Sequence, residues 1–284
     1  MSSGVSPAAA DRRSAHFLSL LTWGREDLDR VWERARRRLA PGAGPGPLAG
    51  SRVALCWETP EAGMLEVFRA GAELAGAQVV LAGPGGGDRS ALPLLAERLA
   101  SWQGAAAVAY RAASHARLLA ATPGAPAPVV SGGTPGSHPF RVLADLFGLD
   151  TLGADVDGLR AVWLGAPAAE LRSWLEALVR YGFRLDLAVP DPAAVDEALC
   201  AYVGVRAAPR LGRAAAPEAV LPRADVVILG GDAHYVGCHR AAARPGAWVF
   251  GASGARPWAA AADAAVAGAL LEDVAARAAG GWRS

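Results

Sequence analysis

The sequence predicts an α/β fold of two lobes, each built on a parallel β-sheet with helices on its faces. Short apolar segments rich in Val, Leu and Ala alternate with amphipathic helical segments along most of the chain, which is the pattern of βαβ units. The alternation runs twice, and a polar connection at residues 150–158 separates the two runs. The 284 residues are 52% hydrophobic, which is ample for a large core.

The first lobe is expected to begin with an amphipathic helix at about residues 25–39. Leu28, Val31 and Trp32 recur there at helical spacing and form one apolar stripe. A loop rich in proline and glycine follows this helix. The next expected strands lie at residues 52–57, 78–81, 105–110 and 129–130, and the expected helices at about 64–75, 91–101, 114–121 and after His138.

The second lobe is expected to repeat the alternation, so that residues 1–150 and 151–262 form separate domains. Its expected strands lie at residues 160–164, 184–188, 225–229 and 247–250, and its expected helices at about 168–181, 193–202 and 260–278. Loops at the carboxyl ends of parallel strands commonly hold ligands, so the cleft between the two lobes is the expected site.

Composition and charge argue against several classes of protein. A net charge of +1 without a basic stripe speaks against a nucleic-acid partner. No apolar window is long enough to span a membrane and the start lacks a secretory signal, so a cytoplasmic protein is expected. The three cysteines are far apart and form no CxxC pair, which suits reduced thiols. The absence of lysine excludes Schiff-base catalysis by that side chain.

Two segments carry candidate functional side chains. Ser131–Arg141 follows an apolar strand and passes through glycine and proline to a His-Pro step, so His138 is the first residue expected to take part in chemistry. Gly230–His239 is expected to be a second loop. Its Asp232 and His234 are candidates for substrate contact or for acid/base chemistry, because histidine titrates near neutral pH.

No metal or cofactor is expected. Cys238 and His239 complete a group of four potential ligands in the second segment, but their spacing matches no standard zinc pattern. Gly165–Glu170 does not match the GxGxxG pattern of dinucleotide-binding proteins.

The order of several short segments resembles the aspartate/ornithine carbamoyltransferase family. The segments that carry the resemblance, together with their spacing, are His16–Leu21, Leu48–Pro60, Arg111, His138–Pro139 and Gly158–Gly165. The resemblance implies two Rossmann-like lobes, the first for carbamoyl phosphate and the second for an amino acid, with a terminal helix at residues 263–284 that returns to the first lobe. It also implies a homotrimer with active sites at subunit interfaces and a small-molecule substrate.

The chain departs from this family where the family binds phosphate. The family carries a Ser-Thr-Arg-Thr-Arg signature at a helix N-terminus, where hydroxyls, guanidinium groups and backbone N–H groups hold the anion. Those positions are Glu61, Ala62, Gly63, Met64 and Leu65 here. Because a carboxylate repels a phosphate, Glu61 and Met64 are expected to contact a neutral or cationic substrate group instead.

Other family residues are kept in part. The resemblance implies that Arg111 and His138 polarise a carbonyl group, whereas the alternatives are a surface ion pair for Arg111 and plain loop architecture for the His-Pro step. Arg141 stands in place of a family glutamine and is expected to balance an anionic substrate. In the second lobe, Ala166–Glu170 replaces an Asp-Gly-Asn-Asn type turn and Ala252–Ala255 replaces a His-Cys-Leu-Pro loop, so standard recognition of ornithine is not expected.

Three functions follow from these observations. The first is a repurposed enzyme, of specialised metabolism, that acts on a carbonyl or carboxylate compound without carbamoyl phosphate. The second is a catalytically inactive homologue that serves as a binding or partner subunit. The third is a true carbamoyltransferase with a rewired phosphate site. The first two are close, and the third is less favoured.

Overall fold

The computed structural model describes residues 15–44, 46–59, 61–81, 100–251 and 256–280. The glycine-rich segment 83–87, most of the helix expected at 91–101 and the segment Ala252–Ala255 lie outside these residues. The chain divides into two compact units, one formed by Met1–Gly133 with Ala264–Ser284 and the other by Thr134–Asp263.

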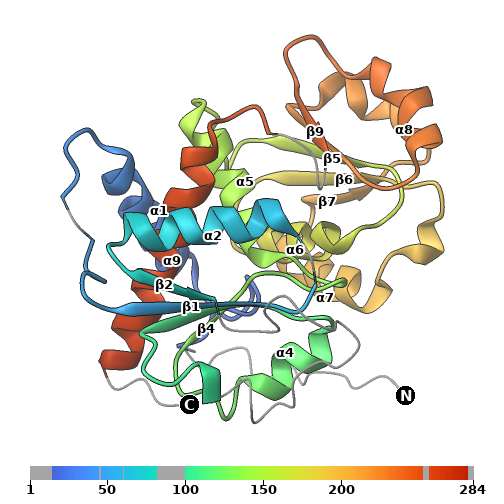
Figure 1. The fold of residues 1–284 in the computed structure, drawn as a ribbon. Helices are drawn as coiled ribbons and strands as arrows, with labels where there is room; N and C mark the ends of the chain where they lie inside the picture. Colours follow the sequence, from blue (N-terminus) through green and yellow to red (C-terminus); the bar gives the residue numbers. More distant parts are fainter. Residues whose placement is uncertain (1–14, 45, 60, 82–99, 252–255, 281–284) are drawn as a thin grey trace. The chain divides into compact units, whose positions relative to one another are not determined.

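The first unit contains a four-stranded parallel sheet in the order β2-β1-β3-β4 (Figure 1). Its strands are β1 (Arg52–Trp57), β2 (Gln78–Leu81), β3 (Ala107–Arg111) and β4 (Val129–Ser131). Its helices within the described residues are α1 (Arg25–Leu39), α2 (Ala62–Leu74), α4 (His115–Ala121) and most of α9 (Ala260–Ala279). The strands β1, β3 and β4 are buried except for Arg52, Trp57 and Arg111 at strand ends, as is usual for parallel strands covered on both faces.

The terminal helix α9 packs against α1 and α2 in this unit. Figure 1 shows α9, in red, beside α1, in blue. Arg38 of α1 donates to Glu272 of α9 at 2.9 Å, and Arg277 pairs with Asp27 at 2.7 Å. The return of the terminal helix to the first unit, which the family resemblance implied, is therefore confirmed.

The second unit contains a five-stranded parallel sheet in the order β7-β6-β5-β8-β9. Its strands are β5 (Arg160–Leu164), β6 (Arg184–Ala188), β7 (Leu211–Arg213), β8 (Val226–Leu229) and β9 (Trp248–Gly251). Its α-helices among the described residues are α5 (Pro139–Thr151), α6 (Ala169–Leu178), α7 (Glu197–Ala207) and α8 (Ala233–His239), with short 3₁₀ turns at Pro192–Ala194, Pro217–Ala219, Leu221–Arg223 and Arg240–Ala242.

The predicted fold class is confirmed, but two local predictions are wrong. The helix expected at 193–202 is a 3₁₀ turn followed by α7, which begins only after Asp196 caps its N-terminus through the backbone N–H of Leu199. The segment expected to be a loop at 230–239 is mostly helix α8, because Asp232 caps it in the same way through Tyr235. The short strand β7 was not expected, since three residues give too little periodicity to recognise.

Candidate functional site

The carboxyl end of the first sheet gathers the side chains that follow β1 and β3. These two strands are adjacent and parallel, and their register pairs Trp57 with Arg111. Residues immediately after β1 therefore lie beside the end of β3, although about fifty positions separate them in the sequence. This arrangement places Glu58, Thr59 and Glu61 next to Arg111.

Arg111 is held by three groups at this end of the sheet. Its Nη1 lies 2.7 Å from Oε2 of Glu61, its Nε donates to Oγ1 of Thr59 at 3.1 Å, and Nη1 also donates to the carbonyl of Gly132 at 3.3 Å. The Arg111 side chain is 16% exposed and that of Glu61 is 31% exposed. The guanidinium is thus neutralised by a carboxylate from the same unit. Both side chains are partly exposed, although the paired Oε2 of Glu61 is itself buried.

Glu58 forms a second and more deeply buried contact network beside the first. Its carboxylate accepts hydrogen bonds from Tyr110 Oη at 2.6 Å, from the backbone N–H of Ala113 at 2.8 Å and from Arg117 Nε at 3.0 Å. The Glu58 side chain is fully buried. Glu58 in turn raises the pKa of Arg117, chiefly through the hydrogen bond between them.

Met64 lies in the first turn of α2, which begins after Glu61, and its side chain is completely buried. The Glu61 side chain makes no capping hydrogen bond to this helix. The first turn of α2 thus presents no hydroxyl and no guanidinium group where a phosphate-binding helix would carry them.

His138 is the N-cap residue of α5 in the second unit and is almost fully buried. Pro139 occupies the first helical position, which suits a residue without a backbone N–H. The preceding turn is closed by backbone hydrogen bonds between Thr134 and Ser137, and the backbone N–H of His138 donates to Oγ of Ser173 at 3.0 Å. The position of His138 is therefore fixed by its own loop and by α6.

Arg141 belongs to a buried group of charges in the second unit. It pairs with Asp263 at 3.3 Å, and Asp263 also accepts a hydrogen bond from Trp258 Nε1 at 2.9 Å. One turn further along α5, Asp145 pairs with Arg256 at 2.8 Å, and both side chains are almost inaccessible to solvent. Burial raises the pKa of Asp145 to about 6, although Arg256 opposes this shift.

The segment at 232–239 forms the short helix α8, whose residues are mostly exposed apart from the buried Val236. Asp232 has a positive φ of 65° and caps α8. His234 and Cys238 lie one helical turn apart, with Nε2 and Sγ separated by 3.9 Å, and His239 Nδ1 contacts Oε1 of Glu218 at 2.5 Å. Within the residues that the structure describes, no three His, Cys, Asp or Glu side chains are placed to hold a metal ion together.

Curated proteins with a similar sequence and solved structures with a similar fold are carbamoyltransferases in both cases. The ornithine carbamoyltransferase of Agrobacterium fabrum is 32% identical over 181 residues, which span 62% of this chain and 59% of the relative. That of Nitrobacter winogradskyi is 28% identical over 224 residues, 75% of this chain and 70% of the relative. No protein-family model matches the chain.

Solved structures of the same enzymes share the fold over almost their whole length. Ornithine carbamoyltransferase from Pyrococcus furiosus superposes with a TM-score of 0.77 at 17% identity, covering 93% of this chain and 96% of the other. A putative aspartate carbamoyltransferase from Trypanosoma cruzi gives a TM-score of 0.73 at 19% identity, covering 95% and 98%.

In sequence and in fold, the chain is similar to the aspartate/ornithine carbamoyltransferase family. The sequence match spans less than two thirds of the first curated relatives, 59% in the three most similar ones reported. The comparisons therefore do not establish the activity, substrate or partners of this chain.

In this carbamoyltransferase-like chain, the expected site residues divide between the two units. Glu61, Met64 and Arg111 belong to the first unit, and the structure brings Glu61 and Arg111 into direct contact. His138, Arg141, Asp232 and His234 belong to the second, where Arg141 pairs with Asp263 and Asp232 caps a helix.

Sequence reasoning did not single out Glu58, Arg117, Asp145 or Arg256, although all four make buried or partly buried ion pairs. A carboxylate directly after an apolar strand was the available signal for Glu58, since such a group requires a partner when buried. An acidic residue within the apolar α5 was the corresponding signal for Asp145. Among the described helices, none is both long and apolar enough to cross a membrane.

Proposed function

We propose that this carbamoyltransferase-family protein does not transfer a carbamoyl group from carbamoyl phosphate and serves as a binding or partner subunit. The observation that supports the proposal is the ion pair between Glu61 and Arg111. It lies at the helix start where the family resemblance implies a phosphate site.

The electrostatics of this pair disfavour a phosphate. An anion approaching the N-terminus of α2 meets the Glu61 carboxylate and is repelled by it. The charge of Arg111 is already neutralised, because its Nη1 lies 2.7 Å from Oε2 of Glu61. The hydroxyl and guanidinium donors of the family signature are also missing. Each charge-assisted hydrogen bond contributes about 1.5–3 kcal/mol, so losing several of them weakens phosphate binding by orders of magnitude.

The test is an assay for carbamoyl transfer. Purified protein is incubated with carbamoyl phosphate and either ornithine or aspartate, and citrulline or carbamoyl-aspartate is measured beside an active ornithine carbamoyltransferase as the positive control. We expect no product above the uncatalysed background. Robust formation of either product would overturn the proposal and support a carbamoyltransferase with a rewired phosphate site.

A second candidate is a repurposed enzyme, and the partial exposure of the same ion pair favours it. Because solvent reaches Glu61 and Arg111, a ligand that offers a carbonyl or carboxylate to Arg111 and an N–H group to Glu61 could replace the pair without leaving either charge unpaired. In this reading Arg111 and His138 polarise the carbonyl. Met64, Arg141, Asp232 and His234 are then candidates for substrate contact.

The two candidates differ in the expected effect of His138→Ala. Small carbonyl and carboxylate compounds are first screened for thermal stabilisation that is lost in Glu61→Gln. For a compound found in this way, an enzyme requires turnover that falls at least tenfold in His138→Ala, while a binding subunit shows no turnover with either protein.

A further inference from the structure

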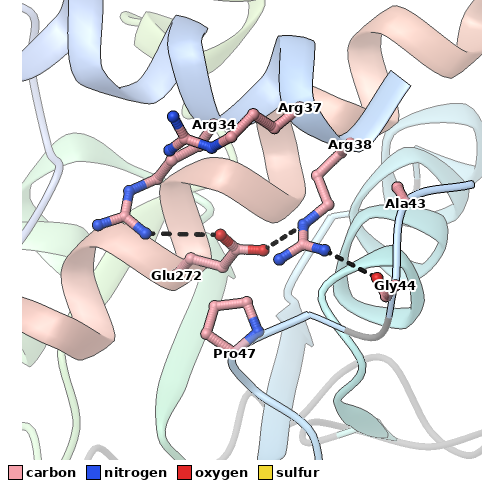
Figure 2. A pocket seen from close by; sticks show the side chains of 7 residues that line it. All are labelled: Arg34, Arg37, Arg38, Ala43, Gly44, Pro47 and Glu272. Carbon is pink, nitrogen blue, oxygen red and sulfur yellow. Dashed lines mark hydrogen bonds and ion pairs between the residues drawn. The ribbon is translucent and has the colours of Figure 1, made fainter. Parts of the chain in front are cut away.

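A positively charged hollow of about 260 Å³ lies in the first unit, between the end of α1 and the terminal helix α9 (Figure 2). It is lined by three arginines from the last two turns of α1, by the segment after that helix and by one acidic residue of α9. The lining residues are Arg34, Arg37, Arg38, Ala43, Gly44, Pro47 and Glu272.

The charges in this hollow do not balance. Glu272 lies between Arg34 and Arg38 in Figure 2, with Oε1 2.9 Å from Nε of Arg38 and Oε2 3.7 Å from Nη1 of Arg34. The lining holds three arginines and this one carboxylate, which leaves an excess of two positive charges. Asp273, which does not line the hollow, is shared among Arg30, Arg34 and Arg277.

Arg37 is the uncommitted cation of the group. Among the described residues it makes no hydrogen bond, ion pair or ring contact, unlike its neighbours Arg34 and Arg38. Basic residues in the last turn of a helix are favoured by the helix dipole, and this accounts for arginines near the end of α1 in general. The dipole does not explain why three of them surround one hollow.

Two of the three arginines are already held in place. Arg38 is fixed by Glu272 and by the carbonyl of Gly44 at 3.1 Å, and Arg34 is fixed by Glu272 and by Asp273 at 3.4 Å. A ligand that binds here would not have to order these side chains, which lowers the entropic cost of association.

We propose that this hollow binds a compact oxyanion of the phosphate class that carries at least two negative charges. Two charges neutralise the excess in the lining, and the planar guanidinium groups match phosphate oxygens with paired N–H donors. Arg37 supplies the contact that the empty hollow lacks. The site shares no residue with the Glu61–Arg111 pair, so it does not depend on the function proposed above.

The test is isothermal titration of the full chain with sodium pyrophosphate at constant ionic strength, with sodium chloride as the reference salt. Arg37→Ala should weaken binding by about tenfold or more, as expected for the loss of one charge-assisted contact. Arg36→Ala is the matched control, because it removes an equal charge from the same turn. The Arg36 guanidinium lies over the ring of Trp32 instead of lining the hollow. The affinity of Arg36→Ala for pyrophosphate should therefore stay within about twofold of that of the parent protein.

Three results would overturn the proposal. No measurable binding to the parent protein would do so. Equal weakening by Arg37→Ala and Arg36→Ala would reveal only a general attraction to positive charge. Loss of binding in Arg111→Ala, with Arg37→Ala unaffected, would place the anion at the other end of the unit and would contradict the proposed absence of phosphate binding there.

Discussion

Glu61 lies where the family resemblance implies a phosphate site, and it supplies a carboxylate at that position. This carboxylate neutralises Arg111 from within the same unit. In this chain β1 and β3 pair in parallel register up to Trp57 and Arg111, which brings the residues after β1 beside Arg111.

At the same scale, Glu58 is predicted to stabilise the first unit. Glu58→Ala removes the acceptor for Tyr110, Arg117 and the backbone N–H of Ala113, so it should lower the free energy of unfolding by about 3 kcal/mol. Urea denaturation of the purified variants would measure this change. The control is Glu66→Ala, which breaks an exposed pair with Arg69 and should leave the midpoint unchanged. Equal midpoints for Glu58→Ala and the parent would show that the buried network adds nothing.

Asp145 is predicted to make stability depend on pH. Its pKa is about 6 in the folded protein and near 3.8 when unfolded, so folding favours the protonated form. The stability that this group contributes is complete below about pH 4 and is lost as the pH rises through 6. A difference of about two pH units corresponds to roughly 3 kcal/mol.

The measurement is urea unfolding of the parent and of Asp145→Asn at intervals between pH 4.5 and 7.5. The variant cannot ionise at this position, so the difference in stability between the two proteins should shrink or change in favour of the variant as the pH rises. Parallel pH profiles would mean that Arg256 keeps Asp145 ionised throughout this range.

Among the helices, the crossing of α2 and α9 depends on two glycines. A Cβ atom added at Gly71 would lie 2.6 Å from the carbonyl oxygen of Ala264 and 2.6 Å from the backbone nitrogen of Gly268. These are backbone atoms and cannot rotate away. The two helices approach this closely because Gly71 and Gly268 carry no side chain at the contact, where the side-chain atom nearest to a Cβ at Gly71 is the Cβ of Ala267.

Gly71→Ala is therefore predicted to destabilise the first unit by about 2 kcal/mol, since the helices must separate to admit the methyl group. Gly63→Ala is the matched control in the same helix. No atom lies within 4 Å of a Cβ at that position, so the higher helix propensity of alanine should raise stability slightly. The melting temperatures of both variants and of the parent protein would measure these changes. A higher melting temperature for Gly71→Ala than for the parent would contradict the close crossing of α2 and α9.

For the whole molecule, we predict a homotrimer, because the resemblance covers the elements of the first lobe through which the family trimerises. Multi-angle light scattering should give about three times the chain mass of 29.0 kDa. Dilution over two orders of magnitude would reveal dissociation. A mass equal to one chain at micromolar concentration would rule out the trimer and would favour a protein that works alone or with a different partner.

The sequence by itself determined the fold class and most strands. Strands β1, β2, β5 and β6 have the predicted bounds, because each is a short apolar or β-branched run set off by turn residues. The sequence also determined that the phosphate signature is missing, which needs only the identity of five consecutive residues. The sequence did not reveal which residues cap the helices of the second unit. For this reason α7 begins later than predicted, and the segment predicted to be a loop is helix α8.

Only the tertiary structure decided which charges meet. Periodicity is a local property, whereas the pairing of Glu61 with Arg111 depends on the register of two strands, and the pairing of Arg38 with Glu272 joins positions 234 residues apart. Arg141 is a further example. The sequence predicts that it balances an anionic substrate, whereas the structure pairs it with Asp263. The partners in an ion pair are fixed by long-range packing. The sequence therefore indicates the candidate side chains but not which of them are already paired with another residue.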